Sequence, residues 1–509
     1  MNIRQAKEYI KNAISLYLKK DEFGAYKMSV VRQRPIFLLG APGIGKTAVM
    51  EQIAQEMGIA LVAYSMTHHT RQSALGLPFI TEKSYGHRKV HVSEYTMSEI
   101  IATIYDTMEE SGIREGILFL DEINCVSETL APSMLQFLQY KVFGRHRVPD
   151  GWVIVTAGNP PEYNKSVREF DVVTMDRLKV MEVEPDYAVW KVYAGERRIH
   201  TAILNYLDLK KDHFYCIEMT VRGRSYVTAR GWEDLSEMLY LYEEANLQVE
   251  EILVGQYIRN EKVAREFTAY YDLYQKYRKD YCIEDILRGA PSPQAIARVK
   301  EAAFDERLSL LGMLLDRVMA DMREVMEQAA YLKDLKLLLQ GTGKAVEAMA
   351  DKMRLEPLLE LLEQQAAGRG KLLENLRSAN TLSEEDGRKL RRVIRFLEET
   401  RKELYGGDTA TAAQGYACLK EKYTGLVKRM KEETRQVQEE LHALFVFAEE
   451  AFAQGNEMLV LVTELTVNNT SARFIAAFGS EDYGRHNQEL MLSERRDEIL
   501  AQMEGLEWE

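Results

Sequence analysis

Cysteine, excess positive charge and long apolar runs are all scarce in this chain of 509 residues. No uninterrupted apolar run is long enough to cross a bilayer, and the amphipathic N-terminus does not resemble a secretion signal. The cysteines are widely separated and show no paired spacing, which argues against a disulfide framework and a cysteine-based zinc site. They are Cys125, Cys216, Cys282 and Cys418. We therefore expect a cytoplasmic protein with reduced thiols and no membrane insertion.

The charge balance is acidic, with 66 Lys and Arg against 79 Asp and Glu and a formal net charge of −13. Because nucleic acids and anionic membranes attract basic surfaces, this balance makes a general nucleic-acid partner unlikely. The composition is 46% hydrophobic and 28% charged, which fits a chain with sizeable cores. The length suggests about three domains.

Short apolar runs bounded by turns recur through the first third of the chain. Runs that are apolar at every position are typical of strands covered on both faces, as in a parallel sheet with crossover helices. The segments 98–110 and 128–140 have helical periodicity. The sequence therefore predicts a doubly wound α/β domain over 1–185. The apolar runs are 36–39, 60–64, 116–120, 152–156 and 178–183.

Helical patterns dominate the remainder. We expect a smaller helical domain over 186–280, with helices at 186–196, 201–207, 228–244 and 249–276. Apolar residues then follow heptad-like spacing, which predicts a long antiparallel helical bundle or arm over 281–509. The segment 457–478 is expected to pack back on this bundle. The three heptad-like seams span 304–325, 390–404 and 423–444.

A Gly-rich stretch ending in Gly-Lys-Thr follows the first apolar run and precedes a helical segment. Glycines let several backbone N–H groups converge on phosphate oxygens, and the helix N-terminus adds its positive end. Lys46 can reach the β- and γ-phosphates, and the Thr47 hydroxyl can ligate Mg²⁺. The sequence thus predicts a nucleoside triphosphate site. Its residues are Gly40, Ala41, Pro42, Gly43, Ile44, Gly45, Lys46 and Thr47. A similar Gly-Thr-Gly-Lys sequence at Gly341–Lys344 lies between leucine-rich helical segments. We expect it to be a helix break and not a second phosphate loop.

Two adjacent carboxylates, Asp121 and Glu122, end the apolar run at 116–120. A strand places Asp121 at its tip, where the carboxylate can hold Mg²⁺. This ion is usually bound by one or two carboxylates, with phosphates and waters as its other ligands. Glu122 can orient and deprotonate an attacking water. The pair therefore favours a hydrolase over a protein that only binds nucleotide.

Three further polar residues are candidates for catalytic roles. Asn159 follows the fourth apolar run and could position the water or sense the γ-phosphate, although Asn-Pro after a strand is more often a turn. Arg177 precedes the fifth run and could act as an arginine finger in a neighbouring subunit, or only form a surface ion pair. Arg230, near the start of a helix in the second domain, could contact the γ-phosphate.

The order of these elements resembles the AAA+ ATPases, and most closely their MoxR-like branch, over residues 1–260. In that resemblance 40–47 correspond to Walker A, 121–122 to Walker B, and Asn159, Arg177 and Arg230 to sensor 1, the arginine finger and sensor 2. The resemblance implies a five-stranded core, a helical lid, bound ATP with Mg²⁺, and hexameric rings with active sites between subunits. It also suggests a loop at 65–78 and a helical insert at 94–111. A hairpin-like stretch at 143–151 departs from the family, because it is shorter than the family's usual hairpin.

The leading functional hypothesis is an ATP-driven remodeller of other proteins. Members of the MoxR-like branch often work with a protein that carries a von Willebrand factor A domain, and such a partner would here be a separate chain. A nucleotide-driven nucleic-acid motor of a restriction-like or defence-like system is the alternative, because one fold supports several functions. A monomeric small-molecule kinase, which needs no residue from a neighbour, is a third possibility.

Overall fold

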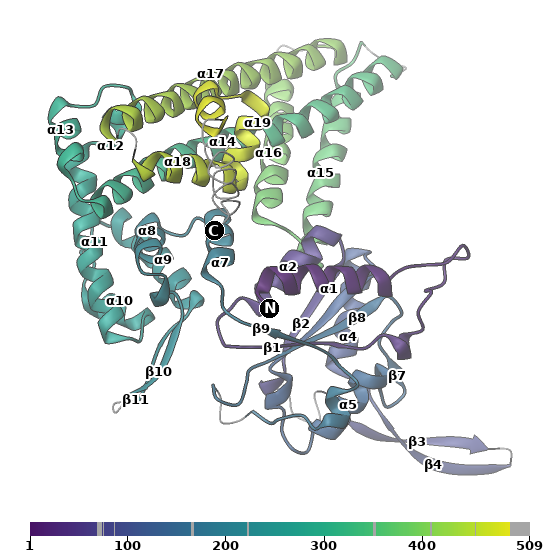
Figure 1. The fold of residues 1–509 in the computed structure, drawn as a ribbon. Helices are drawn as coiled ribbons and strands as arrows, with labels where there is room; N and C mark the ends of the chain where they lie inside the picture. The colour runs from purple at the N-terminus through teal and green to yellow at the C-terminus, as the bar shows by residue number, and fades with distance from the viewer. Residues whose placement is uncertain are drawn as a thin grey trace, which may run out of the picture. The chain divides into compact units, whose positions relative to one another are not determined.

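The computed structural model describes residues 1–68, 74, 76–85, 87–163, 167–220, 223–349, 353–407, 410–452 and 455–488. The chain forms two compact units, and Figure 1 labels many of their helices and strands. The first contains Met1–Val189 together with Gln365–Ile394. The second contains Trp190–Gln364 and the chain from Arg395 onward.

A parallel five-stranded sheet forms the centre of the first unit, as the sequence predicts. Its strand order is β2-β5-β8-β1-β9, and every predicted apolar run is one of these strands. The central strands β5 and β8 are buried at every position except Asp121, because both faces of the sheet are covered. The strands are β1 (Ile36–Gly40), β2 (Ala60–Ser65), β5 (Gly116–Asp121), β8 (Trp152–Gly158) and β9 (Lys179–Val183).

The helices of the first unit pack their apolar side chains against the sheet. Side chains such as Ile104 and Phe137 pack with the strand residues Phe37 and Leu118, and full burial of each contributes about 2 kcal/mol. Ser98 begins α4 by accepting a hydrogen bond from the backbone of Ile101 at 3.3 Å. The helices are α1 (Ile3–Tyr17), α2 (Lys46–Met57), α4 (Glu99–Ser111), α5 (Ala131–Tyr140) and α6 (Val172–Met175), with the 3-10 turns η1 (Val30–Arg32), η2 (Met66–His68) and η3 (Ile123–Cys125).

A hairpin of β3 (Pro78–Tyr85) and β4 (Arg88–Tyr95) lies between β2 and α4, where the sequence predicts no strands. None of its residues is fully buried, and polar side chains occupy both faces, so neither an apolar run nor a clean alternation marks it. The predicted insert at 94–111 is helical only from Glu99. Residues 69–73 and 75 of the expected loop at 65–78 lie outside the described residues. The predicted short hairpin is present as β6 (Val142–Phe143) and β7 (His146–Arg147).

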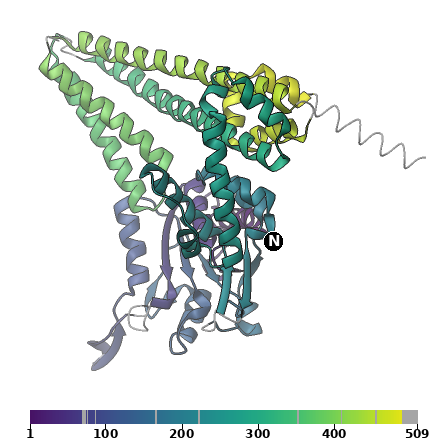
Figure 2. The same cartoon turned by 90° about the vertical axis from the view of Figure 1, so that its left-hand side faces the viewer.

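Part of the C-terminal extension belongs to the first unit. The helices α15 (Glu356–Ser378) and α16 (Glu384–Gly406) lie side by side in both views (Figure 1 and Figure 2). The turn that joins them contacts β2, since the backbone N–H of Leu61 donates to the carbonyl of Ala379 at 3.0 Å. Ala379 is fully buried among the core residues of this unit.

The second unit begins with a small helical region, as predicted. The expected helix at 249–276 is instead two helices, because Asn260 interrupts it and caps α11 by accepting from the backbone of Val263 at 3.1 Å. A hairpin, β10 (Cys216–Thr220) and β11 (Gly223–Val227), was not expected. The helices are α7 (Tyr187–Glu196), which starts in the first unit, α8 (Thr201–Leu209), the turn η4 (Lys211–His213), α9 (Ala229–Glu244), α10 (Glu251–Tyr257) and α11 (Glu261–Tyr281).

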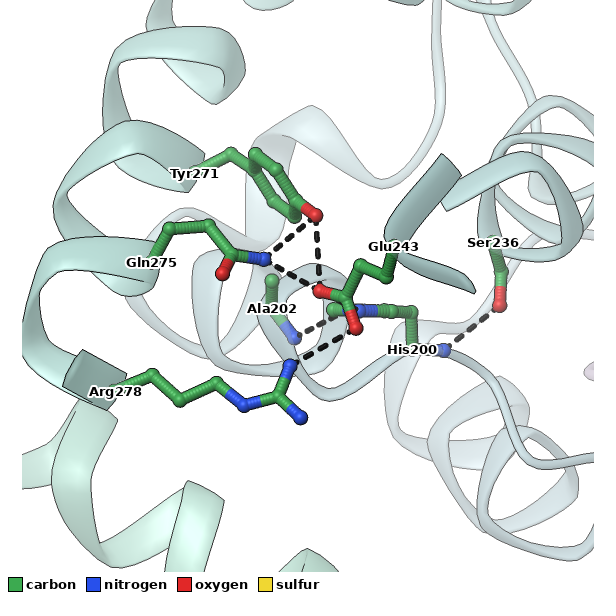
Figure 3. Close-up of polar contacts among 7 residues, drawn as sticks. All are labelled: His200, Ala202, Ser236, Glu243, Tyr271, Gln275 and Arg278. Carbon is green, nitrogen blue, oxygen red and sulfur yellow. Dashed lines mark hydrogen bonds and ion pairs between the residues drawn. The ribbon is translucent and has the colours of Figure 1, made fainter. Parts of the chain in front are cut away.

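A polar network around Glu243 ties three of these helices together (Figure 3). Oε1 of Glu243 accepts from the Tyr271 hydroxyl at 2.9 Å and lies 3.2 Å from Nε2 of His200. Oε2 accepts from Arg278 at 2.9 Å. Burial alone would raise the pKa of Glu243, but the bonds and charges of His200 and Arg278 outweigh it and lower the pKa to about 2.

The helical bundle completes the second unit. Tyr416, near the start of α17, donates to the carbonyl of Leu339, near the end of α14, at 3.0 Å, so these two long helices run antiparallel as predicted. The α14 seam from Leu311 to Val325 and the α17 seam from Val437 to Leu444 are buried in one core, whereas Phe304 is exposed. This core also contains Leu461 and Phe474, which confirms that the segment 457–478 packs on the bundle. The elements are α12 (Ile283–Leu287), α13 (Pro293–Glu301), α14 (Phe304–Ala348), α17 (Ala412–Phe452), α18 (Asn456–Val467) and α19 (Asn469–Phe478).

The helix break expected at Gly341–Lys344 is wrong, because α14 continues through this stretch. A Cβ at Gly343 would lie 2.3 Å from the Tyr416 hydroxyl, so the glycine allows α17 to approach closely. Thr342 is fully buried beside it, and its hydroxyl donates to the carbonyl of Leu338 at 3.0 Å. This packing outweighs the cost of about 1 kcal/mol for glycine inside a helix. Among the described residues, no helix is both long and apolar enough to cross a membrane.

Candidate nucleotide-binding site

The Gly-rich loop joins the end of β1 to the start of α2. Gly43 and Gly45 have φ angles of 74° and 88°, in the left-handed region that residues with a Cβ rarely adopt. Gly40 is packed so closely that a Cβ would lie 2.7 Å from the carbonyl oxygen of Val183. The first N–H groups of α2 have no partner within the helix and carry its positive end, so this turn is built to bind an anion.

Lys46, the first residue of α2, is buried, with only 8% of its surface exposed. Its Nζ donates to the carbonyls of Gly40 at 2.8 Å and Ala41 at 2.9 Å. It also donates to Oδ1 of Asn159 at 2.9 Å. The structure therefore joins two residues that the sequence singles out from motifs more than a hundred positions apart.

Thr47 and Asp121 meet beside this lysine. The Thr47 hydroxyl lies 3.4 Å from Oδ2 of Asp121, the last residue of β5, and Oδ1 of Asp121 accepts from the backbone N–H of Glu122 at 2.9 Å. Hydroxyl and carboxylate oxygens are the ligands that Mg²⁺ prefers, so these two side chains fit that ion. Within the described part of the chain, no group of three or more His, Cys, Asp or Glu side chains is placed to hold a metal. An ion here would take its other ligands from phosphates and water.

Glu122 follows β5 with a φ of 55°, a left-handed conformation that is uncommon for a residue with a side chain and is typical of functional turns. Its Oε2 accepts from the hydroxyls of Ser65 and Thr67, each at 3.0 Å. Sequence reasoning missed both hydroxyl residues. The available signal was their position, since Ser65 ends β2, which pairs with β5, and Thr67 follows in η2.

Asn124 is a second residue that the sequence analysis missed. It is buried, with 5% of its surface exposed, and its Nδ2 donates to the carbonyl of Asn159 at 2.8 Å. A Cβ at Gly158 would lie 2.5 Å from Oδ1 of Asn124, so the glycine leaves room for this amide. The bond ties the end of β5 to the end of β8. Burial, together with the nearby carboxylates of Glu122 and Asp121, raises the pKa of the adjacent Cys125 thiol.

The two candidate arginines are not joined to this cluster by the hydrogen bonds above. Arg177 is exposed in the first unit, after α6 and before β9. Arg230 is an exposed residue in the first turn of α9, in the second unit. Their roles stay predictions.

The described geometry brings backbone donors, a lysine, a metal-type oxygen pair and a carboxylate to the carboxyl ends of β1, β5 and β8. Ligands of open parallel sheets bind at such strand ends. Residues 35–178 match the family model described as "AAA domain (dynein-related subfamily)". The match includes the Gly-rich loop, both carboxylates, Asn159 and Arg177, whereas Arg230 lies beyond it. No match was found among curated proteins. Together the site geometry and the family match show that residues 35–178 form an AAA+ ATPase domain.

Proposed function

We propose that this protein hydrolyses ATP in a hexameric ring of the MoxR-like kind and uses the energy to remodel a partner protein. The observation that supports hydrolysis best is the hydrogen-bonded cluster of Lys46, Asn159, Thr47 and Asp121, with Glu122 adjacent to it. A protein that only stored nucleotide would not need a carboxylate at this position, directly after the one expected to hold Mg²⁺.

In this proposal each side chain has one task. Lys46 exchanges its bonds to the loop carbonyls for the β- and γ-phosphate oxygens, and the N-terminus of α2 contributes N–H donors. Glu122 orients a water molecule and accepts its proton, while Asn159 holds that water or the γ-phosphate in line. Thr47 and Asp121 would hold Mg²⁺, which neutralises phosphate charge when bound.

Two exposed arginines would complete the site. In the proposed ring, Arg177 reaches the nucleotide of the neighbouring subunit and neutralises charge in the transition state. An arginine in this role accelerates hydrolysis about 10³–10⁵-fold in other nucleotide hydrolases. Arg230 contacts the γ-phosphate of its own subunit. The position of Arg177 on the surface of the first unit supports a role toward a neighbour.

The test compares Lys46→Ala with Glu122→Gln in the full chain. Lys46→Ala should lose nucleotide binding. Glu122→Gln should bind ATP normally but hydrolyse it at least about 10² times more slowly than the unaltered protein. Fluorescent ATP-analogue binding and phosphate release measure the two properties. Normal ATP affinity in the lysine variant, or normal turnover in the glutamate variant, would contradict the assignments.

The remodelling role requires a separate experiment. We expect a purified von Willebrand factor A domain protein that binds this chain to stimulate phosphate release, and single- or double-stranded nucleic acid not to do so. Salt-sensitive stimulation by nucleic acid, without any effect of such a protein, would favour a nucleic-acid motor instead.

A further inference from the structure

The turn between α15 and α16 pairs with the open edge of the ATPase sheet. Strand β2 is the outermost strand, and its other neighbour is β5. The N–H of Leu61 donates to the Ala379 carbonyl at 3.0 Å, and Nδ2 of Asn380 donates to the Leu61 carbonyl at 3.2 Å. One backbone carbonyl and one side-chain amide thus satisfy both polar groups of Leu61, as a neighbouring strand would.

This contact is built by the turn itself. Asn380 has a φ of 54°, a left-handed conformation that asparagine tolerates better than most residues. The N–H groups of Asn380 and Thr381 return to carbonyls of α15, those of Arg377 and Leu376, each at 3.0 Å. Ala379 is fully buried and Thr381 is 7% exposed. Because the turn closes on itself and Ala379 is buried, the position of the turn against β2 is fixed.

Strand β2 also reaches the candidate general base. Four residues after Leu61 it ends at Ser65, whose hydroxyl, with that of Thr67, holds Oε2 of Glu122. The same strand pairs along its whole length with β5, which leads directly into Glu122. A displacement of β2 therefore moves the two hydroxyls that hold this carboxylate.

We propose that the turn at Ala379–Thr381 positions Glu122 through β2, and that the helical extension thereby sets the rate of ATP hydrolysis. Asn380 is a positioning residue in this scheme. With the turn docked, two hydroxyls hold Oε2 of Glu122 and so fix the orientation of its carboxylate, whereas a general base must turn an oxygen toward the water whose proton it accepts. Loosening the turn frees the carboxylate and speeds turnover. The inference rests on the proposed role of Glu122 in hydrolysis.

The test is Asn380→Asp in the full chain, an isosteric change that tolerates the same backbone conformation. It replaces the donor that faces the Leu61 carbonyl with an oxygen. We expect faster amide exchange in β2 and a kcat raised about twofold to tenfold, the scale of one lost hydrogen bond, with KM for ATP unchanged. Asn246→Asp is the matched control, because Asn246 is also left-handed, with a φ of 53°, but is exposed in the second unit.

A second background shows whether the effect passes through the hydroxyls. The double variant Ser65→Ala/Thr67→Ala should itself raise kcat, and adding Asn380→Asp should then change nothing further. An undiminished effect of Asn380→Asp in that background would overturn the inference. So would faster exchange in β2 with an unchanged or lower kcat, and in that case the ATPase assignment would stand. No hydrolysis by the unaltered protein would overturn both.

Discussion

Single residues in the ATPase site are held by neighbours as much as by their own position in the fold. Asn159 accepts from Lys46 through its side chain and from Asn124 through its backbone carbonyl. Because Asn124 comes from the turn after β5 and Asn159 from the end of β8, their bond fixes the spacing between two strand ends. In the proposed mechanism, that spacing would set where Asn159 meets a phosphate or a water.

We expect Asn124→Asp to lower kcat about fivefold while ATP affinity changes little. The substitution keeps the shape of the side chain but removes the donor to Asn159, and one such bond is worth about 1 kcal/mol. Phosphate release and nucleotide titration measure the two quantities. Asn205→Asp, another buried asparagine but in the second unit, serves as the control for general destabilisation. A kcat equal to that of the unaltered protein would show that this tether has no catalytic role.

The part of the site that follows directly from strand ends was predictable from the sequence. Lys46, Asp121 and Asn159 each come after an apolar run, and parallel strands bring such positions to one edge. Ser65 and Asn124 were not predictable in the same way. Their roles depend on which side chain a hydroxyl or amide meets across the sheet, and no short sequence pattern records that contact.

At the scale of elements, the packing of the helices α8, α9 and α11 depends on one carboxylate. Glu243 lies in the last turn of α9 and receives hydrogen bonds from residues of α11, while His200 precedes α8 (Figure 3). Its pKa is lowered to about 2, below the ordinary value of 4.5. A depressed carboxyl pKa stabilises the fold above the unfolded pKa, and this contribution is lost as pH falls from 4.5 toward 2.

We therefore expect Glu243→Gln to lower the free energy of unfolding of the second unit by about 3 kcal/mol at pH 7. The difference from the unaltered protein should shrink as pH falls from 4.5 toward 2. Urea unfolding followed by circular dichroism at several pH values measures it. Glu244→Gln, at the exposed neighbouring position, should have little effect at any pH. Parallel stability curves for the Glu243 variant and the unaltered protein would contradict the role of this carboxylate.

Long or fully apolar elements were the ones that the sequence predicted well. All five core strands are continuous apolar runs, and the seams of α14 and α17 repeat over many turns. The hairpins β3–β4 and β10–β11 were missed, because a two-stranded ribbon outside the main sheet needs no continuous apolar run. The course of α14 through Gly343 was also missed, since the hydroxyl of Tyr416 that occupies the space beside it belongs to a helix distant in sequence.

At the scale of the whole molecule, the chain path does not follow the division into two units. Residues 365–394 belong with the N-terminal sheet, although the sequence on both sides of them belongs to the second unit. The helices α15 and α16 therefore each run from one unit into the other. The sequence could not predict this, because heptad-like seams indicate which face of a helix is buried but not against which partner.

The proposed ring makes a prediction about mixed assemblies. Lys46→Ala and Arg177→Ala should each abolish most hydrolysis, and a mixture of the two should recover part of it. In a mixed ring, an intact lysine of one subunit can meet an intact arginine of its neighbour at roughly one interface in four. Phosphate release from mixed and unmixed samples measures whether neighbouring subunits share active sites. No recovery would exclude shared sites, and full activity of Arg177→Ala on dilution would favour a monomeric enzyme.

The pairing of Leu61 with the turn at Ala379 also bears on how this protein can be divided for experiment. A polypeptide that stops before α15 would leave the N–H and carbonyl of Leu61 bare at the border of the sheet, with a hole where the Ala379 methyl group had been. Such a border recruits strands from other molecules. We would therefore expect a truncated ATPase domain to aggregate, and fusion of residues 365–394 to it to prevent this aggregation.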